Sequence, residues 1–455
     1  MQPARPNVLV FFTDQQRHDT TNLHGCPLDL TPNLAGLAQR GTHLRHCFTC
    51  QPVCGPARSC LQTGQYATQT GVWTNGLPLN PGRRTLAHHF NDAGYHTAYI
   101  GKWHLAPEEH RGAVPQDYQG GYQEFLGANT LELVSDAYDT RLWDRTGVER
   151  RLPGYRVDAM SDAVIDYVAR DHAQPWFLFF SLLEPHHQNH RDDYPAPTGY
   201  EERYAGSWMP PDLIAGGGSA ARHWPGYCGM VKRIDEALGR VLDALRSTGQ
   251  LDHTIILFTS DHGCHFKTRN DEYKRSCHEA SIRVPGVIAG PGFAHGGTLP
   301  HLVSLVDLPP TLLDAAGIDV PDTMSGRSLL PLVRDPAAAW PGEVLVQISE
   351  TQTGRAVRTA RWKYCAICPD HDERGQPVSR PHAEVYADHC LYDLMADPWE
   401  QHNLIGRESH REVVAVLRDR LTRRMAEAGE SAPRFIDAPP QPAGQAVVTS
   451  AEAHA

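Results

Sequence analysis

Cys54 and Arg58 are the residues of this sequence whose types and spacing most directly suggest chemistry, and Pro56 stands between them. Proline suits the first turn of a helix, because its missing N–H would have no partner there and its φ is already helical. Cys54 is therefore expected at a helix N-terminus, where free amides and the positive end of the helix dipole favour an anionic ligand. Arg58 lies one helical turn later on the same face, so its guanidinium can hold whatever that side chain becomes. The motif predicts a site that contains the Cys54 side chain and the positively charged guanidinium of Arg58.

Other side chains with ligand or proton-transfer chemistry follow predicted strands. Continuous apolar runs at 7–12, 176–183 and 254–260 predict strands buried on both faces of a parallel sheet, and 96–100 predicts another strand. The carboxyl ends of such strands meet at one edge, where open α/β folds bind their ligands. We therefore expect one pocket at this edge. The residues that follow the four strands are Asp14, Lys102, His104, His186, Asp261 and His262.

The elements that must position these residues predict an α/β fold with a mostly parallel central sheet flanked by helices. The segment 106–155 is irregular, and we expect an inserted loop or subdomain that faces the substrate. The segment 192–219 has no clear periodicity, and we expect another loop. The predicted helices are 31–38, 85–92, 158–171 and 227–247, and a further strand is predicted at 284–289.

The stretch Cys54-Gly55-Pro56-Ala57-Arg58 resembles the Cys-x-Pro-x-Arg signature of the type I sulfatases, which belong to the alkaline phosphatase superfamily. The similarity continues through Ser59 to Gly64. It implies an alkaline-phosphatase-like large domain and a smaller C-terminal subdomain with an antiparallel sheet. It also implies that a maturation enzyme oxidises Cys54 to formylglycine, whose hydrated aldehyde is the nucleophile.

The resemblance further implies a divalent cation, Ca²⁺ in preference to Mg²⁺, bound mainly by oxygen atoms. Gln15 stands where the family usually has a second aspartate. A carboxamide oxygen can coordinate a cation, but it brings one negative charge less, so whether Gln15 is a ligand stays open. The implied ligands are Asp14, Gln15, the converted Cys54, Asp261 and His262.

The resemblance also implies roles for the basic residues. Arg58 and Lys102 would orient and neutralise the hydrated aldehyde and the sulfate. His104 would remove a proton from the hemiacetal after sulfate transfer. His186 and Lys274 would contact the ester oxygens and protonate the leaving group, and these roles need histidines that titrate near neutral pH. The neighbouring His187 and His190 are interpreted as substrate-facing or surface residues, and His278 and Arg283 as structural.

The 455 residues are more than one domain usually needs. A change to proline- and alanine-rich composition at 335–341 suggests a boundary. We expect a catalytic domain at 1–340, a C-terminal α+β subdomain at 341–428, and a tail at 429–455 that is either disordered or an oligomer arm. The stretch 391–404 resembles the small C-terminal subdomain of sulfatases. The predicted elements of the C-terminal subdomain are strands at 344–348, 355–366 and 391–394 and a helix at 408–428.

Composition excludes several classes of partner. The net charge of −11 and the pI near 6.2 argue against nucleic acid or an anionic membrane. No apolar run approaches the ~20 residues of a membrane span. The N-terminus leads straight into the strand 7–12, which is too short and wrongly flanked for a signal peptide, so we expect a cytoplasmic protein. The 11 cysteines fit reduced thiols better than a disulfide framework. Whether the protein forms a homo-oligomer stays open.

Two alternative functions are considered. The spacings Cys47-x-x-Cys50-x-x-x-Cys54 and Cys365-x-x-Cys368 resemble metal or redox motifs, but they are far apart and lack the short partner spacing of a zinc ribbon. Phosphonate monoester and phosphodiester hydrolases share the nucleophile and the metal site, and the pair Asp14-Gln15 resembles theirs. Lys102 and His104 favour a sulfatase. For the substrate we favour a sulfated carbohydrate, with an aryl sulfate as the alternative, because the loops 106–155 and 184–224 are long and polar.

Overall fold

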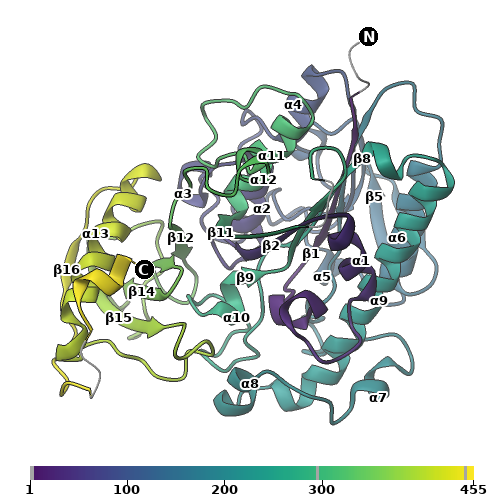
Figure 1. Ribbon diagram of the computed structural model, residues 1–455. Helices are drawn as coiled ribbons and strands as arrows, with labels where there is room; N and C mark the ends of the chain where they lie inside the picture. The colour runs from purple at the N-terminus through teal and green to yellow at the C-terminus, as the bar shows by residue number, and fades with distance from the viewer. Residues whose placement is uncertain (1–4, 294–296, 445–447, 455) are drawn as a thin grey trace.

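The computed structural model describes residues 5–293, 297–444 and 448–454 (Figure 1). The first residues of the expected catalytic domain, 1–4, and the tail residues 445–447 and 455 lie outside the described residues. Within the described ranges, a large sheet with helices on both faces is joined to a smaller, mostly antiparallel sheet, which is drawn in green to yellow in Figure 1. This architecture confirms the predicted fold class.

The large sheet has 11 strands, and its centre is parallel. The neighbours β8–β1–β7–β3–β4 all run in the same direction. Strands β10, β5 and β6 pair in the antiparallel sense nearer the edges. In sheet order the strands are β11 (Gly297–Ser304), β2 (Gly41–Phe48), β10 (Gly286–Ala289), β8 (Thr254–Ser260), β1 (Asn7–Thr13), β7 (Trp176–Ser181), β3 (His96–Lys102), β4 (Glu124–Ala128), β5 (Thr140–Asp144) and β6 (Glu149–Leu152), with β9 (Arg283–Val284) pairing with β2.

Helices cover both faces of this sheet because the central strands are apolar on both sides. Val8, Val10 and Phe12 pack on one face, and Leu9 and Phe11 pack on the other. Helices α2, α4 and α11 cover the first face, and α1, α6 and α9 cover the second (Figure 1). The helices are α1 (Pro32–Arg40), α2 (Cys54–Thr63), α3 (Ala67–Thr70), α4 (Leu86–Asp92), α5 (Leu131–Val134), α6 (Arg156–Val168), α7 (Tyr200–Tyr204), α8 (Pro211–Gly216), α9 (Ala220–Ser247), α10 (Glu279–Ile282), α11 (Leu308–Ala315), α12 (Leu330–Arg334) and α13 (Arg411–Glu427).

The register of the parallel strands brings their carboxyl ends to the same level. Thr13 at the end of β1 pairs with Ser260 at the end of β8. On the other side of β1, Phe12 pairs with Ser181 of β7, which in turn pairs with Gly101 of β3. The residues that follow these four strands therefore converge at one edge of the sheet, as the sequence predicts.

Several predicted elements need correction. The segment 106–155 is not simply an irregular loop, because it contributes β4, β5 and β6 and widens the sheet. The expected loop 192–219 contains the short helices α7 and α8. The strand expected at 284–289 is divided at Pro285, whose missing N–H interrupts pairing, into β9 and the antiparallel β10.

The second sheet begins at β12 (Glu343–Ile348) and continues through β13 (Gly354–Thr359), β14 (Trp362–Ile367) and β15 (Val385–Asp393). The single strand expected at 355–366 is a hairpin of β13 and β14. Part of the expected tail is ordered, because β16 (Arg434–Ile436) pairs in parallel with β15. Among the described residues, no helix combines the length and apolar character needed to cross a membrane.

Candidate active site

Cys54 is the first residue of α2 and is 1% exposed. Val53 has an extended backbone and forms the N-cap, and the Gly55 N–H donates to Asn75 Oδ1 at 2.9 Å. Arg58, one turn later, donates through Nη1 to Ser181 Oγ at 2.7 Å. The thiol and the guanidinium therefore share a buried pocket, as the spacing of the motif predicts.

Basic side chains surround the Cys54 sulfur. Lys274 Nζ lies 3.0 Å from Sγ, His262 Nε2 3.2 Å and Lys102 Nζ 3.6 Å. Burial alone raises the pKa of the Cys54 thiol, but Lys102, Lys274 and His262 outweigh it and hold this pKa well below its ordinary value. The pocket is therefore built to stabilise an anionic group at position 54.

Two carboxylates lie beside the thiol at the ends of β1 and β8. Arg58 Nη2 lies 3.0 Å from Asp14 Oδ2 and 3.3 Å from Asp261 Oδ2. Burial and the Cys54 thiolate raise the pKa of Asp14, but Lys102, His186 and Arg58 outweigh them and keep it below its ordinary value. Burial, followed by repulsion from Asp14, raises the pKa of Asp261 to about 6.

These carboxylates fit a divalent cation. Asp14, Cys54, Asp261 and His262 each offer one ligand atom, and these atoms lie within 4.8 Å of one another. Apart from its ion pair with Arg58, the buried Asp261 Oδ2 has no hydrogen-bond partner among the described residues. A bound cation would use this oxygen and relieve the repulsion between the carboxylates. Two carboxylate donors favour a hard cation.

The Gln15 side chain also lies in the pocket. Its Oε1 is 3.4 Å from Lys274 Nζ, and its Nε2 donates to Tyr194 OH at 3.1 Å. Its backbone is left-handed, with φ of 68°, and its N–H donates to Asp261 Oδ1 at 3.0 Å. This orientation keeps the carboxamide oxygen on the side of the basic residues.

Lys102 and His104 approach the same sulfur from the end of β3, together with Glu132 of α5. Lys102 Nζ lies 2.7 Å from Asp14 Oδ2 and 3.1 Å from Glu132 Oε1. His104 is among the groups that lower the pKa of Cys54, and its Nδ1 is 3.8 Å from Glu132 Oε1. Sequence reasoning missed Glu132, because this residue lies in the segment expected to be irregular.

His186 and Lys274 complete the ring of basic groups. Lys274 Nζ lies 3.1 Å from His186 Nε2, while His186 Nδ1 lies 2.6 Å from the His187 carbonyl oxygen. Burial and then the Lys274 charge lower the pKa of His186. Because Nδ1 faces a carbonyl, it carries the imidazole proton, and Nε2 accepts from Lys274. His187 stacks on His186 with 4.3 Å between ring centroids, whereas His190 is exposed.

All the sequence-predicted site residues thus meet around Cys54, and Ser181, Asn75 and Glu132 are contacts that the sequence did not reveal. No sequence signal marks Ser181 or Asn75, because only the register of β7 and the turn that follows α3 bring them close. The spacing Cys365-x-x-Cys368, considered above only as an alternative metal or redox motif, does not form a cluster, and Cys365 groups with Cys277 and Cys390 instead. All 11 cysteines are buried and free of disulfides in the described chain.

Comparison with known proteins agrees with this geometry. A family model described as Sulfatase matches residues 6–318, and a second, described as N-sulphoglucosamine sulphohydrolase, C-terminal, matches residues 271–427. The chain is 27% identical over 452 residues to the ulvan-active sulfatase of Formosa agariphila, covering 94% of this chain and 83% of that protein.

Two solved structures share the fold. One, of a protein in complex with its substrate D-glucosamine-2-N,6-O-disulfate, has a TM-score of 0.74 at 24% identity and covers 93% of this chain and 98% of its own. The phosphonate monoester hydrolase of Agrobacterium radiobacter has a TM-score of 0.68 at 24% identity, and the match covers 93% of this chain and 96% of the hydrolase. The Sulfatase family model matches more than half of this chain. The chain therefore belongs to the sulfatase family of the alkaline phosphatase superfamily and is a sulfuric ester hydrolase.

Proposed function

We propose that this enzyme hydrolyses the sulfate ester of a carbohydrate, with a hydrated formylglycine made from Cys54 as the nucleophile and Ca²⁺ as the bound cation. Mg²⁺ is the alternative ion. The observation that carries this proposal is the position of the Cys54 sulfur, with Lys274 Nζ at 3.0 Å and His262 Nε2 at 3.2 Å. Asp14, Asp261, His262 and Gln15 would hold the cation together with position 54.

A sulfate ester needs its negative charge neutralised at the site of attack. Arg58, Lys102 and Lys274 supply fixed positive charge in a pocket from which water is largely excluded, where electrostatic stabilisation is strongest. When bound, the divalent cation would add positive charge beside the sulfate oxygens and position 54. Lys102 keeps its charge because Asp14 and Glu132 pair with it at 2.7 and 3.1 Å.

Two histidines have different roles in proton transfer at position 54. His104 is among the groups that lower the pKa of Cys54, and its Nδ1 faces Glu132 at 3.8 Å, so we assign it the removal of a proton from the group at position 54. The neutral His186 accepts a hydrogen bond from Lys274 at 3.1 Å. Lys274 therefore carries the proton that the leaving alcohol oxygen needs, and His186 orients its ammonium group.

The preference for a sulfated sugar rests on the relatives. One curated relative is named for activity on ulvan, and one solved structure contains a disulfated glucosamine. The chief alternative is phosphonate monoester hydrolysis, which the pair Asp14-Gln15 and the fold shared with a phosphonate monoester hydrolase favour. Lys102 and His104 favour sulfate.

A direct comparison of two substrates tests the assignment. We expect kcat/KM for an aryl sulfate to exceed that for the matching aryl phosphonate monoester by about tenfold or more, a difference of ~1.4 kcal/mol in transition-state binding. Sulfated monosaccharides should then be screened for desulfation. A clearly higher kcat/KM for the phosphonate would reverse the order of the two functions.

Maturation can be read from one tryptic peptide. Cleavage after Arg45 and Arg58 gives a peptide that contains Cys47, Cys50 and Cys54. When the protein is produced with a formylglycine-generating enzyme, this peptide should be about 18 Da lighter than the unmodified one. The loss arises because the CH2–SH side chain becomes an aldehyde, in which oxygen replaces sulfur and two hydrogens are lost. Alkylation should label Cys47 and Cys50 but not position 54, so the two neighbouring thiols serve as internal controls. Three labelled cysteines under these conditions would contradict the conversion.

We also propose to divide the chain near residue 340, between α12 and β12, into a catalytic domain and a C-terminal subdomain. The elements before this point belong to the large sheet and its helices, and those after it belong to the second sheet. The pairing of β16 with β15 favours counting residues 434–436 with the subdomain.

A further inference from the structure

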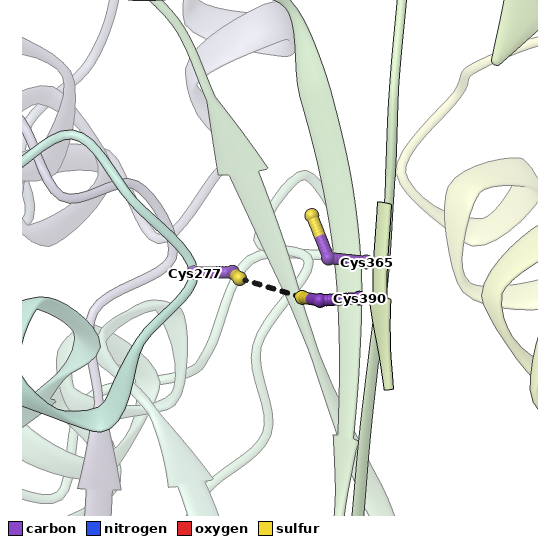
Figure 2. Close-up of side chains that lie close together, drawn as sticks. All are labelled: Cys277, Cys365 and Cys390. Atoms are coloured by element: carbon purple, nitrogen blue, oxygen red, sulfur yellow. Dashed lines mark hydrogen bonds between the residues drawn. The ribbon is translucent and has the colours of Figure 1, made fainter. Parts of the chain in front are cut away.

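Three cysteine side chains from distant parts of the sequence meet outside the active site (Figure 2). The sulfur atoms of Cys277, Cys365 and Cys390 lie within 4.8 Å of one another, and those of Cys277 and Cys390 are 3.5 Å apart. The three residues are 2%, 0% and 2% exposed. We call this group the thiol triad.

The thiol triad joins a segment of the catalytic part to the second sheet. Cys365 of β14 and Cys390 of β15 are directly opposite each other in the second sheet. Cys277 comes from the catalytic part, between Lys274 and α10, and its side chain points toward Cys390 in Figure 2. The triad therefore lies where the segment that carries an active-site lysine contacts the C-terminal sheet.

The surroundings of the triad combine an apolar cluster with the nearby buried side chains of His278 and Lys363. It belongs to a buried cluster with side chains such as Phe48 and Ile282. Among the described residues, no carboxylate or imidazole joins the three sulfurs as a potential ligand. A donor set made only of sulfur selects soft cations such as Cu⁺ and Zn²⁺ and disfavours Ca²⁺ and Mg²⁺.

The spacing of the sulfurs suits one ion at their centre. A metal–thiolate bond of about 2.3 Å places the sulfurs around one ion roughly 4 Å apart. The 3.5 Å between Cys277 and Cys390 and the limit of 4.8 Å for the whole triad lie around this value.

We propose that Cys277, Cys365 and Cys390 bind one soft, thiophilic metal ion, Cu⁺ or Zn²⁺, which ties the catalytic segment to the C-terminal sheet. On binding, the thiols lose their protons to solvent and three sulfur–metal bonds form, with no change in oxidation state. The site is independent of the sulfatase proposal, since none of the three cysteines contacts Cys54. The competing outcome is a disulfide between Cys277 and Cys390.

Metal analysis of the whole protein tests the proposal. The chain is expressed as its Cys54→Ala variant, in medium supplemented with Zn²⁺ and Cu²⁺, and purified under reducing conditions with excess Ca²⁺. The substitution and the Ca²⁺ keep soft metals out of the active site. We expect about one zinc or copper ion per chain by elemental analysis, with the metal retained after dialysis. Absence of both metals, or an intact mass lower by two hydrogens, would overturn the proposal.

Matched variants assign the metal to the triad. Adding Cys277→Ala should lower metal content at least about tenfold after dialysis, because only two sulfur ligands remain. Adding Cys368→Ala should leave it unchanged, since Cys368 is equally buried at 3% exposure but lies outside the triad. Anomalous scattering from crystals of the Cys54→Ala protein covers the case in which Cys277→Ala does not fold. A metal peak between the three sulfurs supports the site, and a peak elsewhere contradicts it.

Discussion

Replacing Cys54 with alanine is expected to abolish sulfate ester hydrolysis while the protein remains folded. The side chain lies at the meeting point of Lys274, His262 and Lys102, and no other nucleophile among the described residues is held by all three. Removal of a covalent nucleophile costs about 10⁴-fold or more in kcat. The measurement is kcat with a saturating aryl sulfate, alongside circular dichroism and thermal unfolding.

Cys60→Ala provides the matched control for this experiment. Cys60 lies in the same helix and is fully buried, but its sulfur belongs to the core and not to the pocket. We expect this variant to keep the activity of the unsubstituted enzyme. Near-full activity of Cys54→Ala would show that the nucleophile lies elsewhere, whatever the outcome of the substrate comparison.

Asp14→Asn is expected to lose the bound divalent cation and most of the activity. The carboxylate is fully buried, faces Cys54 Sγ at 3.5 Å, and pairs with both Lys102 and Arg58. An amide of the same shape removes the negative charge that would hold the cation. Loss of several kcal/mol of charge stabilisation corresponds to a decrease of about 10³-fold in kcat. Elemental analysis of the purified variant measures bound Ca²⁺ or Mg²⁺ independently of activity.

Asp235→Asn separates this effect from the loss of a buried carboxylate in general. Asp235 is 1% exposed and accepts hydrogen bonds from the Asn33 and Leu34 N–H groups at the start of α1. Neither partner is one of the proposed metal ligands. We expect it to lower the unfolding temperature but to retain the metal. Should Asp14→Asn keep a full complement of metal, the proposed ligand set would be wrong.

The sequence predicted the central strands and their carboxyl ends well, because long apolar runs such as 254–260 have few other uses in a chain of this size. Those strand ends carry Asp14, Lys102 and Asp261, so most of the site followed from the strands. The edge strands were missed. For example, β6 (Glu149–Leu152) is short and mostly charged, and its pairing depends on β5 and not on its own pattern.

Contacts that depend on tertiary register could not be predicted. Glu132 reaches Lys102 only because α5 follows β4, a strand whose five residues carry no clear signal. The grouping of the cysteines could not be inferred from their spacing, for a geometric reason. Residues separated by three positions on an extended chain point to opposite faces, so Cys365 and Cys368 cannot converge, whereas Cys390 lies directly across from Cys365.

The near-complete enclosure of α2 has a consequence for the order of events during biosynthesis. Every residue from Cys54 to Thr63 is buried, and Cys54 is only 1% exposed. A modifying enzyme needs its target in an extended, accessible segment, which the finished protein does not offer. Oxidation of this thiol would therefore have to precede the docking of the helix onto the sheet. Protein that folds first would be trapped as inactive thiol, and adding the modifying enzyme later would not recover it.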